Sequence, residues 1–185
     1  TFIKSPKKLS IIIVNNVLYF NNSSGDITAV DINSGIMLWQ MPTQNTTIYE
    51  DSFLLKNSNL VSNNKIIIFS NNKNEFYAID LKSGNIIWKQ NINSSLQPSI
   101  INNLIFTVTN EGFLTIIDST KGNIIRITDI FSSIKKKKRK KLKPVGFVVA
   151  KENIYLTTNQ GRLFIIDIET GKTKLINKID NNKIS

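Results

Sequence analysis

The stretches "AVDINSGIMLW" at residues 29–39 and "AIDLKSGNIIW" at residues 78–88 are two copies of one pattern. Ala, Asp, a Ser-Gly pair and Trp keep the same places in both copies. A weaker form recurs as "TIIDSTKGNIIR" at residues 115–126 and as "FIIDIETGKTKL" at residues 164–175. Because a regular internal repeat is the signature of repeat architectures, this pattern decides the fold class.

The conserved positions of the pattern predict a tight turn between two strands. An Asp carboxylate can accept backbone N–H bonds from the turn that follows it, and Gly tolerates the left-handed backbone of such a turn. A Trp four residues after the Gly suits packing between neighbouring sheets. The structural positions predicted from the repeat are Asp31, Gly35, Trp39, Asp80, Gly84, Trp88, Asp118, Gly122, Asp167 and Gly171.

Each copy follows another short apolar run, as in "NVLYFNN" at residues 16–22 and "KIIIFSNN" at residues 65–72. A further strand precedes each unit, for example at residues 9–14 and 145–150. The turn between the two middle strands has Gly or Asn six residues before the Asp, which suits the positive φ of hairpin turns. These turn residues are Gly25, Asn74, Gly112 and Gly161. The unit is therefore about four antiparallel strands, and no segment has a helical pattern.

Stacked four-stranded units of this length are typical of a β-propeller. We predict an all-β chain of about four blades of four-stranded antiparallel sheet, in a single domain spanning residues 1–185. The repeats are predicted at about residues 8–48, 57–92, 96–130 and 144–180, with a basic inter-blade loop at residues 132–144.

Composition narrows the chemistry that the chain can perform. It has no Cys and no His, so disulfides, thiolate chemistry and the commonest general base and metal ligand are absent. No apolar run approaches the roughly 18 residues of a membrane-spanning helix. The chain opens "TFIKSPKK" without an initiating Met, so we expect an internal piece of a longer protein.

The pattern A-x-D-x-x-[ST]-G-x-x-x-W resembles the tryptophan-docking repeat of the PQQ-like (quinoprotein-type) β-propellers. Residues 29–39 and 78–88 match every position of it. The third and fourth copies keep the Asp and Gly but place Arg126 and Leu175 where the Trp stands. They replace the Ala by Thr115 and Phe164, up to a shift of one residue, and the third copy has Lys121 at the Ser/Thr position.

Within that superfamily the chain most resembles the BamB family of outer-membrane β-barrel assembly factors. The resemblance implies an eight-bladed ring, of which four repeats are about half. It also implies a non-catalytic scaffold, without catalytic, cofactor-binding or metal-binding residues, that binds periplasmic domains of the barrel-assembly pore. The expected location is the periplasm, in association with the outer membrane, through a signal peptide and lipid anchor that are not in this chain. A complete four-bladed propeller is the alternative for the ring.

Two other functions are compatible with the same repeat. A PQQ-dependent dehydrogenase would need a quinone, a divalent cation and a catalytic Asp, but the acidic residues show no convergent cluster. Asp26, Glu75 and Glu111 fall in separate hairpin turns, and the four repeated Asp residues belong to turns. A ligand-sensing propeller module of a larger receptor is the other alternative, since one fold hosts many functions.

The formal net charge of +11 is concentrated in one segment. Without its eight cations the surplus falls from 11 to 3. One hypothesis is an electrostatic contact with an anionic membrane or an acidic partner. The other interpretation is a solvated inter-blade loop; no nucleic acid is expected, because no aromatic residue is interleaved for base stacking. The cations are Lys135, Lys136, Lys137, Lys138, Arg139, Lys140, Lys141 and Lys143.

Overall fold

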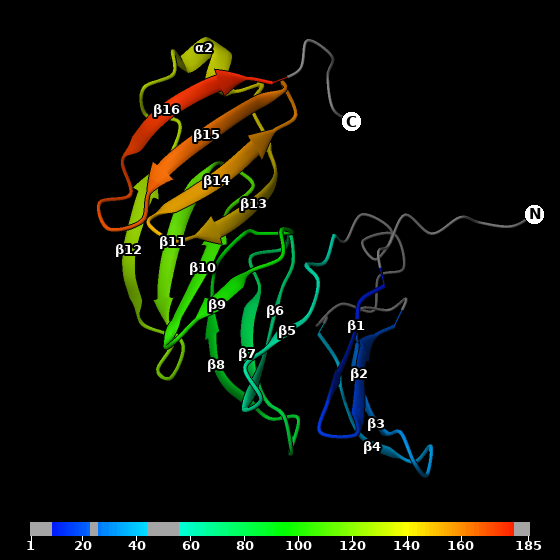
Figure 1. The fold of residues 1–185 in the computed structure, drawn as a ribbon. Coiled ribbons are helices and arrows are strands. Elements are labelled where there is room, and N and C mark those ends of the chain that lie inside the picture. The colour runs from blue at the N-terminus through cyan, green and yellow to red at the C-terminus, as the bar shows by residue number, and fades with distance from the viewer. Residues whose placement is uncertain (1–8, 23–25, 44–55, 180–185) are drawn as a thin grey trace, which may run out of the picture. The chain divides into compact units, whose positions relative to one another are not determined.

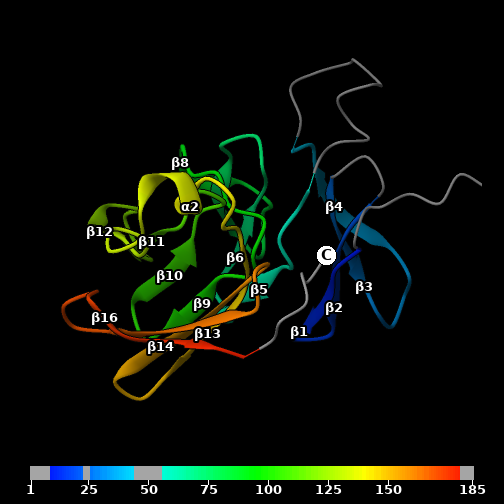
Figure 2. The ribbon, with the colours of Figure 1, turned by 90° about the horizontal axis from the view of Figure 1, so that it is seen from above.

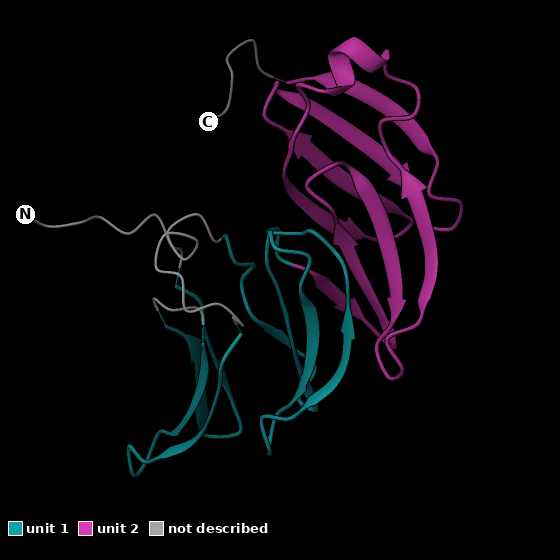
Figure 3. Ribbon diagram, turned by 180° about the vertical axis from the view of Figure 1, so that it is seen from behind, with its two compact units in different colours: residues 1–97 teal, residues 98–185 magenta. Residues whose placement is uncertain are grey.

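The computed structural model of the chain describes residues 9–22, 26–43 and 56–179. Figures 1 and 2 show the fold in two views, and Figure 3 colours its two compact units, residues 1–97 and 98–185. The described strands form four sheets, and each sheet has four strands. All four sheets are antiparallel and follow chain order, so the predicted all-β, propeller-type sheet architecture is confirmed.

Unit 1 contains two of these sheets. The first consists of β1 (Ile11–Val14), β2 (Val17–Asn21), β3 (Ile27–Asp31) and β4 (Met37–Met41). The second consists of β5 (Val61–Ser62), β6 (Ile66–Ser70), β7 (Phe76–Asp80) and β8 (Ile86–Gln90).

Unit 2 contains the other two sheets. The first consists of β9 (Ser99–Ile101), β10 (Leu104–Val108), β11 (Phe113–Asp118) and β12 (Ile124–Asp129). The second consists of β13 (Pro144–Ala150), β14 (Asn153–Thr158), β15 (Arg162–Asp167) and β16 (Thr173–Lys178).

Each unit has its own buried interior, supplied by the middle strands and, in unit 2, also by Phe131, which follows β12. In unit 1, a core cluster joins the two sheets and includes Ile27, Ala29, Ile67 and Phe69, all fully buried. In unit 2, the rings of Phe131 and Phe164 meet with their centroids 5.2 Å apart. Alternate side chains of a strand point to opposite faces of its sheet. The apolar side chains on one face of the middle strands therefore pack against the neighbouring sheet of the same unit.

A β-bulge recurs at the same place in all four sheets, between the third and fourth strands. In the first sheet Ala29 pairs with Trp39 and Val30 pairs with Met37, so Leu38 is the extra residue. The second, third and fourth sheets shift register at the equivalent place. Leu38 is exposed, and so is its paired neighbour Met37, so exposure is shared by this part of β4.

The register corrects one alignment made from the sequence. The residues that face Arg126 and Leu175 across the ladder, in the place of Ala29, are Ile116 and Ile165. Thr115 and Phe164 are their neighbours and point to the other face of the sheet.

The expectation that no helix is present was wrong. Lys136–Arg139 forms a short helix, α2, in the connection between β12 and β13. Four residues are too few to produce a helical hydrophobic period, although Lys and Arg are good helix formers. Of the predicted turn residues, Gly25 lies outside the described residues, and Asn74, Gly112 and Gly161 all have positive φ.

Candidate functional site

The repeated Asp-Gly turn is a local hydrogen-bonded structure. In the first sheet, Oδ1 of Asp31 accepts bonds from the backbone N–H and the hydroxyl of Ser34, both at 2.8 Å. The N–H of Gly35 donates to the Asp31 carbonyl at 2.9 Å, and Gly35 has φ of +69°. The carboxylate is therefore already occupied by the turn that it closes.

The other three copies repeat this geometry. Asp80 accepts from Ser83, and Asp167 accepts from Thr170, each through both N–H and hydroxyl at 2.8 Å. Asp118 accepts from the Lys121 N–H at 2.7 Å; lysine has no hydroxyl to supply the second bond.

The pKa values of Asp31, Asp80 and Asp167 are lowered. The backbone N–H of Ser34, followed by its hydroxyl, lowers the pKa of Asp31, and Ser83 lowers the pKa of Asp80 in the same way. At Asp167 the largest contribution to the lowered pKa comes from Lys174, whose Nζ lies 2.7 Å from Oδ2. The groups are ionised at neutral pH and stabilise their turns in that form.

Trp39 joins the two sheets of unit 1. Its Nε1–H donates to the Leu81 carbonyl at 3.1 Å, and its ring lies over Gly84. A methyl group added to Gly84 would come within 2.6 Å of Cδ2 of Trp39. The Tyr19 hydroxyl donates to the same carbonyl at 3.1 Å, and the Tyr19 and Trp39 rings are 5.8 Å apart. Because Gly84 has no side chain, the indole of Trp39 from the preceding sheet can pack directly against the Gly84 backbone.

The second Trp lies within the second sheet of unit 1 as part of a stacked pair. The rings of Trp88 and Phe76 are 6.2 Å apart and nearly parallel, and Phe76 is fully buried. This contact places the indole on the face that Phe76 occupies.

In unit 2, Arg126 occupies the position of the Trp and makes an analogous contact by different chemistry. Its guanidinium donates to the Ile168 carbonyl at 2.6 Å and also to the Glu169 carbonyl. Ile168 follows Asp167 as Leu81 follows Asp80, so the acceptor is the equivalent carbonyl of the next turn. Thr128 lies against Gly171, where an added methyl group would come within 2.5 Å of its Oγ1. The sequence shows only the loss of the indole, whereas the shared acceptor appears only in three dimensions.

The basic segment is anchored to unit 2 at both ends. We call residues 130–143 the basic insert. Ile130, Phe131 and Leu142 are buried, and the N–H of Phe131 donates to the Asp129 carboxylate at 3.0 Å. The N–H of Arg139 donates to the Lys135 carbonyl at 3.0 Å and closes the turn of α2. The lysine side chains are exposed, but the backbone that carries them is folded.

The insert lies at the end of unit 2 where β12 ends and β11 begins (Figures 1 and 2). Arg139 forms an ion pair with Asp129 at 2.5 Å, and its guanidinium lies 5.9 Å from the centre of the Phe113 ring. The side-chain amide of Asn159 donates to the Lys141 carbonyl at 3.2 Å. Contacts with β11, with β12 and with the turn after β14 therefore hold the insert in place.

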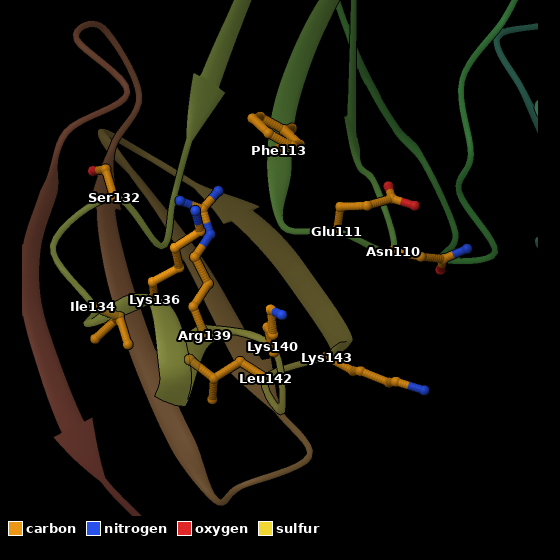
Figure 4. Close-up of a pocket in the computed structure, with 10 residues that line it drawn as sticks. All are labelled: Asn110, Glu111, Phe113, Ser132, Ile134, Lys136, Arg139, Lys140, Leu142 and Lys143. Carbon is orange, nitrogen blue, oxygen red and sulfur yellow. The ribbon is translucent and has the colours of Figure 1, made fainter.

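Two hollows flank α2, and together they are lined by seven of the eight predicted cations. The larger, which we call the basic cleft, has a volume of about 660 Å³ and is lined by residues of the insert and of the turn before β11 (Figure 4). The smaller has a volume of about 450 Å³. Lys136, Arg139, Lys140 and Lys143 line the cleft, and Lys135, Lys138 and Lys141 line the smaller hollow.

Sequence reasoning missed the residues that complete the cleft. Asn110, Glu111 and Phe113 come from a hairpin turn and the strand after it, and Leu142 is the one apolar residue among the last basic positions. Leu142 is the only one of these with a signal in the sequence, because an apolar residue inside a basic run suggests an anchor.

Two further findings concern the described residues. No helix in residues 9–22, 26–43 and 56–179 is both long and apolar enough to cross a membrane. Over those residues, no group of three or more His, Cys, Asp or Glu side chains is placed to hold a metal ion.

Comparison with known proteins gives a family and several similar folds. A family model described as outer membrane protein assembly factor BamB matches residues 6–128. A search of the curated proteins gave no match. The crystal structure of BamB from Moraxella catarrhalis is similar with a TM-score of 0.68 and 17% identity, over 94% of this chain and 51% of that one.

Other solved structures are similar to a comparable degree. The Cps50 (Swd1) β-propeller domain of Myceliophteria thermophila has a TM-score of 0.73 and 14% identity, over 95% of this chain and 56% of that one. The quinohemoprotein alcohol dehydrogenase of Comamonas testosteroni has a TM-score of 0.68 and 13% identity, over 93% of this chain and 35% of that one. The chain thus spans about half the length of the first two structures. At these identities the likeness shows the fold.

Proposed function

The chain belongs to the family of the outer membrane protein assembly factor BamB, and from this membership we propose that it is a non-catalytic β-propeller scaffold that binds other proteins. The family match over residues 6–128 carries the proposal. The proposed partners are periplasmic domains of the barrel-assembly pore, and the proposed location is the periplasm at the outer membrane.

The chemistry of the repeated carboxylates supports this proposal. Asp31, Asp80 and Asp167 each accept two bonds from their own turn, and their pKa values are lowered. A general base works best when its pKa lies near the operating pH. Turn carboxylates with lowered pKa values suit a structural role better than proton abstraction.

The direct test is binding between purified full-length protein and the purified periplasmic domains of the pore from the same organism. We expect saturable binding by isothermal titration calorimetry, with dissociation constants of about micromolar or tighter. A chain of the same length in which the repeats are scrambled is unsuitable because it would not fold; an unrelated propeller serves as the control. Absence of binding to every periplasmic domain would reject the proposal.

A quinoprotein function is the second candidate, favoured by the similarity to the Comamonas testosteroni dehydrogenase fold. The test is a titration of the full-length protein with PQQ in the presence and absence of Ca²⁺, followed by dye-linked alcohol oxidation. The scaffold proposal expects neither tight, metal-dependent quinone binding nor turnover. Observation of both would replace it.

A further inference from the structure

The basic cleft of unit 2 combines a concave shape, an apolar lining and unpaired cations. We propose that it binds an acidic segment of a protein partner, with an apolar side chain of that segment between Phe113 and Leu142. This inference rests on the proposed scaffold function, since it assigns a binding surface and a partner chemistry to the same protein.

The shape of the cleft suits a peptide side chain with its flanking backbone. Its volume of about 660 Å³ falls within the range of roughly 300–1,000 Å³ typical of ligand-binding pockets. Phe113, Ile134 and Leu142 contribute apolar side chains to its lining, and Lys136 and Arg139 extend toward Phe113 (Figure 4). Such a site would bury an apolar anchor and leave charged neighbours at the rim, as protein interfaces do.

The charges of the cleft select an acidic occupant. In the described residues, Lys136, Lys140 and Lys143 form no ion pair within 4.0 Å, and all three are exposed. Arg139 is held by Asp129, which fixes the orientation of its guanidinium beside Phe113. Glu111 is the one acidic residue in the lining. A segment with several carboxylates would therefore meet three lysines that form no ion pair with the described residues.

A peptide fits these observations better than a membrane surface. Binding to a membrane surface is strengthened when apolar side chains insert beside the cations. Three of the four apolar residues of the insert are turned inward instead, because Ile130, Phe131 and Leu142 are 1%, 0% and 7% exposed, and the fourth, Ile134, is half-buried and lines the two hollows. The cations also surround hollows on two sides of α2 and do not share one lining.

The second hollow provides a matched control. It is lined by Lys135, Lys138 and Lys141 of the same insert, so removing these three changes the net charge as much as removing the three cleft lysines. Ile134 and Leu142 line it too, but it has no aromatic wall. The two triple variants lose the same charge. A difference in their peptide binding therefore reports the contribution of the cleft itself, apart from the positive potential of the whole insert.

The test measures fluorescence anisotropy of labelled Glu-Glu-Leu-Glu-Glu with the full-length protein at 150 mM salt. The cleft variant is Lys136→Ser/Lys140→Ser/Lys143→Ser, and the control variant is Lys135→Ser/Lys138→Ser/Lys141→Ser. Because contacts at a formed site add to the shared long-range attraction, we expect the cleft variant to weaken binding about tenfold or more and the control variant about threefold or less. Thermal melts verify that both variants are folded.

Two further probes identify the chemistry of the occupant. The peptide Glu-Glu-Ser-Glu-Glu is expected to bind more weakly than the Leu peptide, and Gln-Gln-Leu-Gln-Gln is expected not to bind. Phosphatidylglycerol vesicles are expected to distinguish the two triple variants far less than the peptide does.

Several results would overturn the inference. These are the absence of peptide binding by the unmodified protein, equal weakening by both variants, indifference to the Leu anchor, and binding to vesicles but not to peptides. If only the cleft inference is wrong, the unmodified protein still binds the periplasmic domains of the pore. Absence of pore-domain binding rejects the scaffold function whatever the peptide shows, so the two failures are distinguishable.

Discussion

At the scale of single residues, glycines at equivalent turn positions meet different surroundings. Gly35 and Gly84 have nearly the same φ, +69° and +72°. An added methyl group at Gly35 meets nothing within 4 Å in the described residues, whereas at Gly84 it meets the Trp39 ring. A side chain at Gly35 would therefore strain only the backbone, whereas a side chain at Gly84 would also overlap the Trp39 ring.

We predict that Gly84→Ala destabilises the protein more than Gly35→Ala. The shared left-handed backbone costs a side chain about 1–2 kcal/mol at either site. The overlap with Trp39 adds about 1–3 kcal/mol at Gly84. Chemical denaturation followed by Trp fluorescence measures both, and equal losses would contradict docking of the indole on the glycine.

Trp39 itself provides a second prediction at this scale. We expect Trp39→Ala to cost about 3–5 kcal/mol, as for other large packed aromatic residues. Trp39→Phe keeps much of the ring contact and loses the hydrogen bond to Leu81, worth about 1 kcal/mol. Melting of the Ala variant at the temperature of the unmodified protein would show that the contact contributes nothing.

The lowered pKa values of the Asp31 and Asp80 carboxyl groups predict a loss of stability in acid. Their folded pKa values are lowered, so their contribution is present above the unfolded pKa of about 3.9 and is lost as pH falls through the folded pKa. We expect the melting temperature to fall below pH of about 4. Asp31→Asn/Asp80→Asn keeps a side-chain oxygen acceptor without a titrating charge, so its melting temperature should change less over that range; an identical profile would contradict the assignment.

At the scale of elements, the fourth strand of the first sheet in each unit contacts the second sheet of that unit, and the chemistry of this contact differs between the two units. β4 uses the indole of Trp39, and β12 uses the guanidinium of Arg126, each donating to the carbonyl after the next Asp. The bulge before that position is present in both sheets. The geometry of the element is thus retained although the side chain differs.

We predict that Arg126→Ala destabilises unit 2 by about 1.5–3 kcal/mol, the typical contribution of hydrogen bonds from a charged group. Arg126→Lys should recover less than half of this loss, because an ammonium group lacks the planar fork that reaches both carbonyls. Lys121→Ala, in an exposed turn position of the same sheet, is the control and should change stability by less than about 0.5 kcal/mol. Urea denaturation measures all three, and equal effects at Arg126 and Lys121 would reject the docking role.

At the scale of the whole molecule, the charge is unevenly distributed along the chain. Eight of the 24 basic residues lie between residues 135 and 143. Lysines held close together on a folded backbone repel one another, and salt screens that repulsion. We therefore expect the repulsion between the lysines of the insert to lower the free energy of unfolding of the protein.

We predict that replacing the seven lysines of the insert by Ser, while keeping Arg139 and its pair with Asp129, raises the melting temperature at low salt. The formal charge falls from +11 to +4 in this variant. At about 1 M salt, where the Debye length is about 3 Å, the difference should largely disappear. Calorimetry at both salt concentrations measures it, and a lower melting temperature at low salt would indicate that the lysines stabilise the fold.

The repeated pattern was sufficient to predict the sheets because it depends on local chemistry. Asp31, Ser34 and Gly35 lie within five residues of one another, so their turn can be inferred from spacing alone. The contact between Arg126 and Ile168 joins residues 42 positions apart, and the sequence contains no sign that a guanidinium replaces an indole there. The register at Ile116 depends on a bulge, which a regular two-residue period cannot reveal.

The sequence by itself determined the class of fold: four repeated units, each a meander of short strands closed by an Asp-Gly turn. Turn preferences and apolar alternation act over a few residues, and they can therefore be inferred without coordinates. Only the tertiary structure decided which carbonyl Trp39 and Arg126 reach, and that the basic insert folds around Phe131 and Leu142. It also decided which lysines border the cleft beside Phe113, because these arrangements depend on contacts between segments that are distant in the chain.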